Sequence, residues 1–447
     1  MSIPSHNIKR NIIIFAVSVC FFTARSFSQD VPATVYKAGS LKGKMIDCGF
    51  TGDANYHAIV HASDGNVYYV VCNHHPNINA HMFRYNPRTD EVSTVADLGK
   101  VLGEDPTKTV PQGKVHGDLY EHDGKLYFGT HVGYDRLGSE DHDPYPGGHF
   151  MSYDLVTGKF EDFGIGVAEE GMVSMNMGRK RQRLYALTWP KAIFVYYDLK
   201  TGTMKSFGES VVGHFFDSKT NKESGGSVPR SLGIDPRTGN VYWFNMDETI
   251  NCYNYRTDTI ETLEEPSLGL PVLKAKNSRV SWRAIRWNNY DSRFYGLTNP
   301  AEYLFAYDPQ KSEIEVIDRI APGPAKKSGE FSQPCLSFEL SSDGRTVYYV
   351  SGYNDEDEKL ISLVTYDIPL RHYTNHGPIV LQDGRNPTTC QGMEVGRDGN
   401  LYIVGVIPVE DIQSKKGKKL LKIRTVAEKK ELSEVSEVNL VVMKDPL

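Results

Sequence analysis

The chain has 447 residues, enough to bury a large hydrophobic core, and its formal net charge of −6 at pH 7 argues against a nucleic-acid-binding protein. Aromatic residues make up 11% of the sequence, with 26 tyrosines and 40 glycines, which favours short strands joined by glycine turns over a helical protein. Its 6 cysteines are too sparse and irregularly spaced for a disulfide scaffold.

The N-terminal residues have the pattern of a secretory signal peptide. Lys9 and Arg10 precede an apolar run over residues 11–22, and small residues near position 28 predict cleavage there. The run is too short to span a bilayer comfortably, and the residues before Cys20 make a poor lipoprotein signal. We therefore expect a secreted or periplasmic protein with a signal peptide over residues 1–28 and a single domain over residues 29–447.

One sequence pattern repeats seven times along the rest of the chain. Each copy has a short strand, a tight turn often containing Asp-Gly, and a second strand with an aromatic residue near its start. A second hairpin follows the first six copies, so a repeat of roughly 55 residues supplies four antiparallel strands. The expected second strands begin at Val67, Leu126, Leu184, Val241, Phe294, Val347 and Leu401.

This repeat predicts an all-β fold, a seven-bladed β-propeller of four-stranded antiparallel blades. The last copy lacks a clear fourth strand, and residues 41–49 resemble the fourth strands elsewhere, so we expect the N-terminal strand to close the ring. The basic stretch at residues 414–424 is interpreted as a solvated strand, followed by a charged C-terminal tail from about residue 425. The basic run at residues 179–181 is interpreted as a solvated hairpin tip.

Two histidines of the second repeat are the first candidates for chemistry. A tight turn at Asp123-Gly124 would place His116 and His131 opposite each other, with Cβ atoms about 5 Å apart, and a different turn length would make them diagonal neighbours. Neighbouring imidazoles shift each other's pKa and suit proton transfer near neutral pH. A structural pair bonded to backbone carbonyls is the alternative.

Cationic and aromatic side chains are expected at the same rim of the propeller. Lys191 follows a second strand, and Arg230 and Arg283 each begin an inner strand. Together with the two histidines they would form a crescent suited to a sugar that carries a carboxylate or sulfate group. Trp189 and Trp282 are expected to stack on sugar rings. Ordinary surface roles are the alternative for each of these residues.

A second candidate site is centred on His57, which begins the inner strand of the first repeat. The same turn arithmetic pairs it with Cys72, which is followed by Asn73-His74-His75, and this group leaves a metal site open although no established zinc spacing is present. The sequence contains no P-loop, nucleophile elbow or dinucleotide-binding fingerprint. The chemistry that these histidines suggest requires no cofactor, and a structural metal ion is left open.

The segment KVHGDLYEHDGKLYFGTHVG, Lys114–Gly133, resembles the histidine-bearing blade of the secreted β-propeller ulvan lyases. That resemblance implies cleavage of a rhamnose–uronate polymer by β-elimination, with both histidines of the segment in the catalytic site and Lys191 in place of an arginine that neutralises the substrate carboxylate. The family also uses a tyrosine on its third blade, and residues 171–178 contain none. The proton donor is therefore left open, with the second histidine or Tyr134 as candidates.

A related group of propellers acts on rhamnose linked to glucuronate, and His57 resembles its key histidine in position. The two resemblances together imply a polysaccharide lyase for ulvan-like or arabinogalactan-type glycans, with His116 as base and His131 as a second proton-transfer or orienting group. An exo-acting α-L-rhamnosidase centred on His57 and a non-catalytic glycan-binding propeller are the alternatives. We expect a monomer that binds an acidic polysaccharide or oligosaccharide, and neither nucleic acid nor a membrane span.

Overall fold

The computed structural model describes most of the unit Pro32–Leu447. The predicted signal peptide, Tyr134 and the basic stretch at 414–424 lie outside the described residues. The described residues are 34–37, 39–133, 136–208, 215–217, 222–224, 229–245, 249–263, 281–299, 303–320, 337–354, 359–409 and 436–447.

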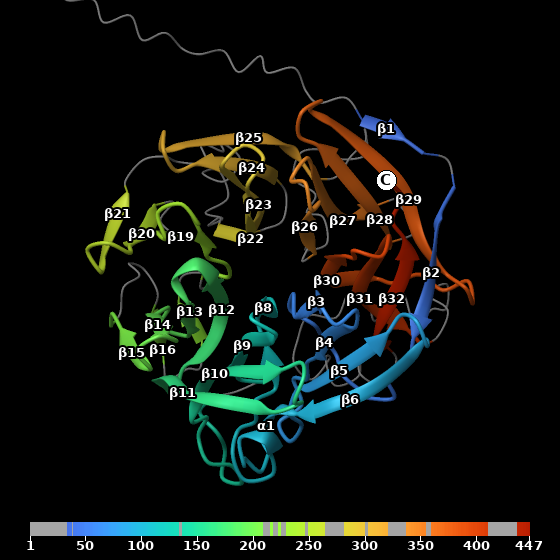
Figure 1. Ribbon diagram of the computed structural model, residues 1–447. Helices are drawn as coiled ribbons and strands as arrows, with labels where there is room; N and C mark the ends of the chain where they lie inside the picture. Colours follow the sequence, from blue (N-terminus) through green and yellow to red (C-terminus); the bar gives the residue numbers. More distant parts are fainter. Residues whose placement is uncertain are drawn as a thin grey trace, which may run out of the picture. The chain divides into compact units, whose positions relative to one another are not determined.

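Four of the described sheets have four antiparallel strands each, paired in the order of the sequence (Figure 1). The strands of these sheets are β3 (Ile59–His61), β4 (Val67–Val71), β5 (His81–Asn86) and β6 (Glu91–Asp97); β12 (Gly171–Gly178), β13 (Arg183–Trp189), β14 (Phe194–Asp198) and β15 (Thr203–Ser206); β18 (Gly233–Ile234), β19 (Val241–Phe244), β20 (Ile250–Asn254) and β21 (Thr259–Leu263); and β22 (Ser281–Asn288), β23 (Arg293–Asn299), β24 (Tyr303–Asp308) and β25 (Glu313–Arg319).

The second repeat forms a related sheet whose first strand is split in two. Both β7 (Lys114–Val115) and β8 (Tyr120–His122) pair with β9 (Lys125–His131), and β10 (Gly147–Asp154) and β11 (Phe160–Ala168) follow. Short elements lie between the sheets. They are the helix α1 (Leu98–Val101), the 3₁₀ turn η1 (Arg179–Arg181) and the hairpin of β16 (Phe215–Asp217) and β17 (Lys222–Ser224).

The largest sheet combines the two C-terminal repeats with the N-terminal strands. Its two halves meet where β2 runs parallel to β29. One half contains β26 (Phe338–Leu340), β27 (Thr346–Asn354), β28 (Lys359–Asp367) and β29 (His372–Leu381), with β1 (Thr34–Tyr36) alongside β29; the other contains β30 (Thr389–Val395), β31 (Asn400–Pro408), β32 (Ser436–Lys444) and β2 (Leu41–Ile46).

The strand positions agree with the sequence pattern in most places. Each of the seven predicted second strands begins within one residue of its expected start. The N-terminal strand β2 pairs antiparallel with β32, as the expected closing strand requires. The prediction of a charged tail to the end of the chain is wrong, because Ser436–Lys444 forms β32. Its apolar residues Val438, Leu440 and Val441 are buried between sheets, which outweighs the charged residues that precede them.

Aspartates in the hairpin turns explain why the first strands end where they do. In the turn between β3 and β4, the Asp64 carboxylate accepts hydrogen bonds from the Asn66 N–H at 2.9 Å and from the Tyr68 hydroxyl at 2.8 Å. The turn between β30 and β31 repeats this arrangement with Asp398 and Tyr402. An Asp-Gly turn followed by a tyrosine therefore fixes the hairpin through the side chain as well as the backbone.

Apolar residues of neighbouring sheets pack against each other face to face. Val70 of β4 and Phe128 of β9 belong to one buried cluster, and Phe150 of β10 and Leu184 of β13 belong to the next. First strands of successive sheets are also in contact, including β12 with β18, β18 with β22, β26 with β30 and β30 with β3. These features make the fold all-β and propeller-like. Among the described helices, none has the length and apolar character needed to cross a bilayer.

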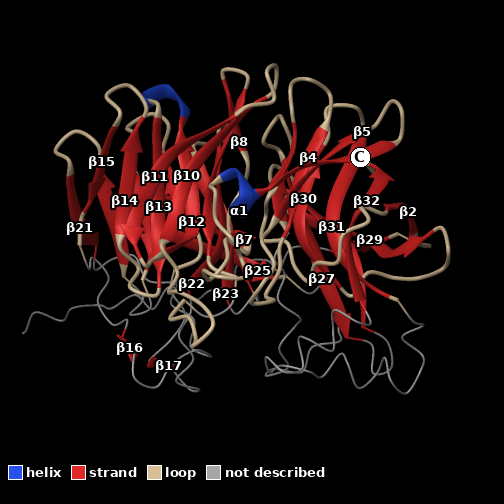
Figure 2. Ribbon diagram, turned by 90° about the horizontal axis from the view of Figure 1, so that it is seen from below, coloured by secondary structure: helices blue, strands red, loops and turns tan. Residues whose placement is uncertain are grey.

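The two ends of the first strands face different surroundings. Figure 2 shows β7 and β8 toward opposite ends of their sheet. The hairpin turns that join first and second strands, including η1, lie at the end of β8. His116, which follows β7, and His131, the last residue of the second strand β9, lie at the end of β7. Polar side chains at the strand ends lie outside the packed apolar faces between sheets. Each end of the strands can therefore hold a binding or catalytic site.

Candidate functional site

The two candidate histidines lie near each other, but not directly opposite. Lys114 pairs with His131, because the register of the first strand changes between β7 and β8. His116 is consequently a diagonal neighbour of His131, the second of the two arrangements expected from the sequence. The centroids of the imidazole rings are 5.4 Å apart with an interplanar angle of 69°. Both side chains are buried, with 3% and 5% of their surface exposed.

Tyr56 of the first repeat stacks on His116. An isolated parallel bridge joins the backbones of the two residues, and the centroids of their rings lie 4.3 Å apart at an angle of 14°. The Tyr56 hydroxyl lies 3.2 Å from Nε2 of His74, and Nδ1 of His74 lies 2.8 Å from a carboxylate oxygen of Asp53. Asp53, His74 and Tyr56 thus form a hydrogen-bonded chain that ends beside His116.

Arg230 determines the tautomer of His116. Its guanidinium lies 3.3 Å from Nε2 of His116. A guanidinium only donates hydrogen bonds, so Nε2 of His116 is the acceptor and carries a lone pair. Burial lowers the pKa of His116 well below its usual value, and the positive charges of Arg230 and the neighbouring cations lower it further. His116 is therefore neutral at neutral pH, and its proton-accepting atom Nε2 becomes available when the Arg230 guanidinium turns to another acceptor, such as a substrate carboxylate.

The pKa values of the other titratable groups of the site are shifted as well. Burial, followed by the charges of Lys114 and Arg230, lowers the pKa of His131 well below its usual value. Burial raises the pKa of Tyr56, so its hydroxyl stays protonated. Burial also acts to raise the pKa of Asp53, but the hydrogen bond and charge of His74 outweigh it and the net pKa is lowered. Asp53 is the ionised acid of this group.

Cations outnumber the ionised acid around the two histidines. The Lys114 ammonium lies 5.7 Å from the centroid of the Tyr56 ring. Arg283 is buried, and its charge acts on the pKa of Tyr56, His57 and His116 together. Arg230, Arg283 and Lys114 all act on the pKa of His116, whereas the Asp53 carboxylate acts on that of Tyr56. A protein of net charge −6 therefore concentrates positive charge at this end of the strands, as an anion-binding site requires.

The wall beside His131 is formed by Trp189 and Gly171. The half-buried indole of Trp189 meets the imidazole edge to face, with centroids 6.0 Å apart and an interplanar angle of 76°. A Cβ atom at Gly171 would collide with Nδ1 of His131. Position 171 therefore has to be glycine for the third sheet to approach this histidine.

Of the predicted binding residues, Trp282 does not join this site. Trp282 is 1% exposed and packs between Phe244 and Phe305, so the prediction that it stacks on a sugar is wrong. The register irregularity of β22 at this position turns its indole into the core. The side chain of Lys191 is exposed, and its backbone N–H donates to the Glu170 carboxylate at 2.9 Å. Lys114, which pairs with His131, is a further lysine beside the histidines.

The predicted pairing of His57 with Cys72 is also wrong. Cys72 bridges to Ala54, and the His57 N–H donates to the Gln391 carbonyl at 3.1 Å. The reason is the backbone of His57, whose φ of 70° interrupts the strand before β3 begins. Burial and the charge of Arg283 lower the pKa of His57 well below its usual value. The part of the chain that the structure describes holds no group of three or more His, Cys, Asp or Glu arranged for a metal.

Sequence reasoning missed Tyr56, Asp53 and Lys114, and it named His74 only as part of a possible metal site. Lys114 could have been found, because it lies two residues before His116 and alternation along a strand brings both toward His131. The chain of Asp53, His74 and Tyr56 could not, since these residues lie in irregular segments on either side of a hairpin and no period relates them.

Comparison with known proteins identifies the fold and no more. No protein-family model and no curated protein matches the sequence. The chain is similar to the solved structure of U3-55K, with a TM-score of 0.51, 10% sequence identity, and coverage of 90% of this chain and 98% of that chain. It is also similar to a chain in the mitotic checkpoint complex, with a TM-score of 0.45, 12% identity and coverage of 91% and 96%. The first similarity agrees with an all-β, propeller-like fold.

Proposed function

We propose that the protein is a secreted or periplasmic polysaccharide lyase that cleaves rhamnose–uronate glycans by β-elimination. The observation that carries the proposal is the convergence of a neutral His116, a protonated Tyr56 and three cations at one end of the strands. β-Elimination at a uronate needs these three functions: a base, an acid and a partner for the carboxylate. It uses no cofactor.

The proposal includes a seven-bladed propeller. The largest sheet divides at the parallel contact between β2 and β29 into two halves, each with four strands on the main path, and β1 adds a short strand beside β29. Each half then matches the four-stranded sheets of the other repeats, and β2 supplies the fourth strand of the last blade. Such closure leaves the first strands around a common centre, so their starting residues share one mouth.

The uronate carboxylate is assigned to the cations Arg230, Arg283 and Lys114. Removal of the C5 proton places negative charge on the carboxylate, and fixed positive charges stabilise that charge as it develops. The arginines also provide forked donors that match a carboxylate. Arg230 already lies at hydrogen-bonding distance from His116, which places the carboxylate partner beside the base.

His116 is assigned as the base and Tyr56 as the acid. The C5–H bond breaks, its proton moves to His116, and its electron pair forms the C4–C5 double bond. The C4–O4 bond breaks in the same reaction, and O4 leaves with the proton of the Tyr56 hydroxyl. After the product leaves, His116 releases its proton to water. His74, held at Nδ1 by Asp53, takes up a proton from water at Nε2 and passes it to Tyr56 through the 3.2 Å contact. His131 orients His116 by its edge-to-face contact.

Product analysis on a panel of rhamnose–uronate glycans tests the proposal. The expected product is a 4,5-unsaturated uronate, which absorbs in the ultraviolet, and His116→Ala should abolish its formation. A matched control is His372→Ala, which changes a half-buried histidine of the outer strand β29. If no glycan of the panel yields the unsaturated product, the lyase proposal is wrong. Release of free rhamnose without the unsaturated product would favour a hydrolase.

The alternative of a rhamnosidase centred on His57 has one observation in its favour. Nε2 of His57 is buried and has no hydrogen-bond partner among the described residues. His57 makes no ion pair with any carboxylate in the described part of the chain. Arg286, whose charge acts on His57, is itself paired with two acids, Asp118 and Glu339. These two carboxylates are therefore engaged with the arginine. A non-catalytic glycan-binding protein would bind the same panel without turnover.

A further inference from the structure

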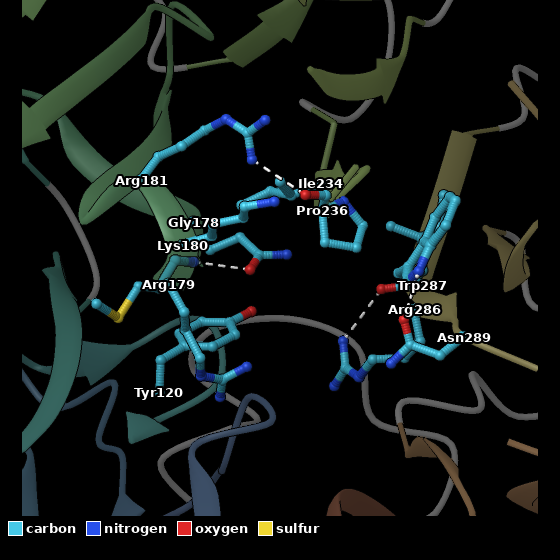
Figure 3. A pocket seen from close by; sticks show the side chains of 13 residues that line it. Tyr120, Gly178, Arg179, Lys180, Arg181, Ile234, Pro236, Arg286, Trp287 and Asn289 are labelled. Carbon is cyan, nitrogen blue, oxygen red and sulfur yellow. Dashed lines mark hydrogen bonds between the residues drawn. The ribbon is translucent and has the colours of Figure 1, made fainter. Parts of the chain in front are cut away.

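A cavity of about 360 Å³ lies at the other end of the first strands, where the hairpin turns are. It is separate from the histidine site, because β12 runs from Gly171, beside His131, to Gly178 at the cavity, which spans about 23 Å. Figure 3 shows side chains from several sheets around the cavity. The lining residues are Tyr120, Asn176, Met177, Gly178, Arg179, Lys180, Arg181, Ile234, Pro236, Ile285, Arg286, Trp287 and Asn289.

The lining contains four cations and no acid among the residues described. Three of the cations are consecutive, Arg179, Lys180 and Arg181, and form the turn η1. None of the three makes an ion pair with any residue in the described ranges, whereas the fourth, Arg286, is paired with Asp118 at 2.6 Å. The prediction of a solvated hairpin tip is confirmed, because this run is the turn between β12 and β13 and Arg179 and Lys180 are exposed. The same turn forms one wall of the cavity.

The two arginines of this run are held by groups that leave their charge uncompensated. Nε of Arg179 donates to the Glu121 carbonyl at 2.9 Å, and its guanidinium lies 5.8 Å from the centroid of the Tyr120 ring. The guanidinium of Arg181 donates to the carbonyls of Pro236 and Arg237 at 3.0 and 3.1 Å. Carbonyl oxygens and aromatic rings orient a guanidinium but carry no net negative charge.

The opposite wall offers polar and aromatic groups. Figure 3 shows Trp287 and Asn289 across the cavity from Arg179. The indole N–H of Trp287 donates to the side-chain oxygen of Asn289 at 2.9 Å, which leaves the amide N–H₂ group of Asn289 without a partner in the part of the chain described. An amide donor and an indole are groups that bind sugar hydroxyls and ring faces.

We propose that this cavity is a second binding site, which takes a carboxylate or sulfate group carried by a ligand of the size of one sugar. Arg179 and Lys180 bind the anionic group, and Asn289 and Trp287 bind the body of the sugar. The volume lies at the lower end of the range for small-molecule sites. The proposal does not depend on the lyase chemistry, because no residue of the histidine site lines the cavity.

Calorimetric titration with D-glucuronate, a 6-sulfated hexose, inorganic sulfate and glucose tests this site. The titrations are made with the wild-type protein and with R230Q/K114Q, which removes two of the cations assigned to the carboxylate, so that binding at the histidine site is recognised by its loss in that variant. Binding of the two anionic sugars should persist in R230Q/K114Q and weaken at least tenfold in R179Q/K180Q. Glucose and inorganic sulfate should each bind at least tenfold more weakly than the anionic sugars.

The matched control is K200Q/R256Q, which removes the same charge from exposed turns between outer strands. This control should leave binding unchanged. The proposed site would be wrong if R179Q/K180Q bound the ligands as tightly as the wild type. It would also be wrong if K200Q/R256Q lost as much binding as R179Q/K180Q. Glucose or inorganic sulfate binding as tightly as the anionic sugars would overturn the assignment of an anionic sugar. If the lyase proposal is wrong, no unsaturated product forms, but the titrations at the cavity give the same result. Failure of the lyase proposal and failure of the second binding site can therefore be told apart.

Discussion

The imidazole of His116 lies parallel to the phenol ring of Tyr56, with centroids 4.3 Å apart and an interplanar angle of 14°. The two residues belong to neighbouring repeats, and the stacking brings the ring of a proton-accepting histidine against the ring of a proton-donating tyrosine. A base and an acid that act on adjacent carbon atoms of one sugar need such proximity.

Replacement of Tyr56 by phenylalanine should remove the acid and keep the stacked ring. We expect kcat on a rhamnose–uronate substrate to fall about 10²–10⁴-fold, the usual contribution of a general acid, with little change in KM. Tyr290→Phe, which removes the hydroxyl of an exposed tyrosine, is the control. A kcat within threefold of wild type for Tyr56→Phe would remove Tyr56 from the mechanism.

Asp53 and His74 should act on the reaction only through Tyr56. Asp53→Asn and His74→Ala are each expected to lower kcat about tenfold to a hundredfold, because they leave the Tyr56 hydroxyl without a relay. In the Tyr56→Phe protein neither change should lower kcat further, since residues that act as a unit are not additive. Additive losses in steady-state kinetics would assign Asp53 and His74 a structural role.

The pH dependence of kcat/KM should report the charge of Arg230. Burial and then this charge lower the pKa of His116 below 6.5, so the base form persists into weakly acidic solution and the acid limb of the profile lies below pH 6.5. Arg230→Gln removes the cation, which raises the pKa of His116 and moves the acid limb upward. A profile that does not move would show that His116 is not the titrating base.

Protonation of the buried histidines should destabilise the protein in mild acid. His116 and His131 have folded-state pKa values well below 6.5, and burial is the main cause. Their contribution to stability is complete above pH 6.5 and is lost as the pH falls, because the unfolded state then binds more protons. The free energy of unfolding should fall by up to about 2.7 kcal/mol per pH unit. Denaturant unfolding between pH 7 and pH 5 measures it, and H116Q/H131Q should flatten the dependence.

The sequence repeat predicts the strands because each hairpin carries its own turn chemistry. Asp64 and Tyr68 hold their turn by local hydrogen bonds, and such contacts are visible in a short window of sequence. The strand β32 was missed because charged residues precede it and its partner strand β2 lies at the other end of the chain. Local patterns do not reveal a pairing that depends on burial against a distant segment.

The candidate site is predictable only where it lies on regular strands. The proximity of His116 and His131 follows from hairpin geometry, although the register change after β7 makes them diagonal. The approach of Tyr56 to His116 depends on packing between two sheets and on the left-handed backbone of His57. Neither has a sequence period, so the acid of the proposed reaction was found only in the structure.

The two tryptophans expected to bind sugar should respond differently to replacement. Trp282 is packed between Phe244 and Phe305, so Trp282→Ala should lower the free energy of unfolding by about 3–5 kcal/mol through the lost burial and the cavity it leaves. Trp189 is half-buried beside His131, so Trp189→Phe should change stability by less than about 1.5 kcal/mol and raise KM for the glycan instead. Denaturant unfolding and steady-state kinetics on both variants measure these effects. A raised KM for a stable Trp282→Phe protein, with none for Trp189→Phe, would contradict the placement of the two residues.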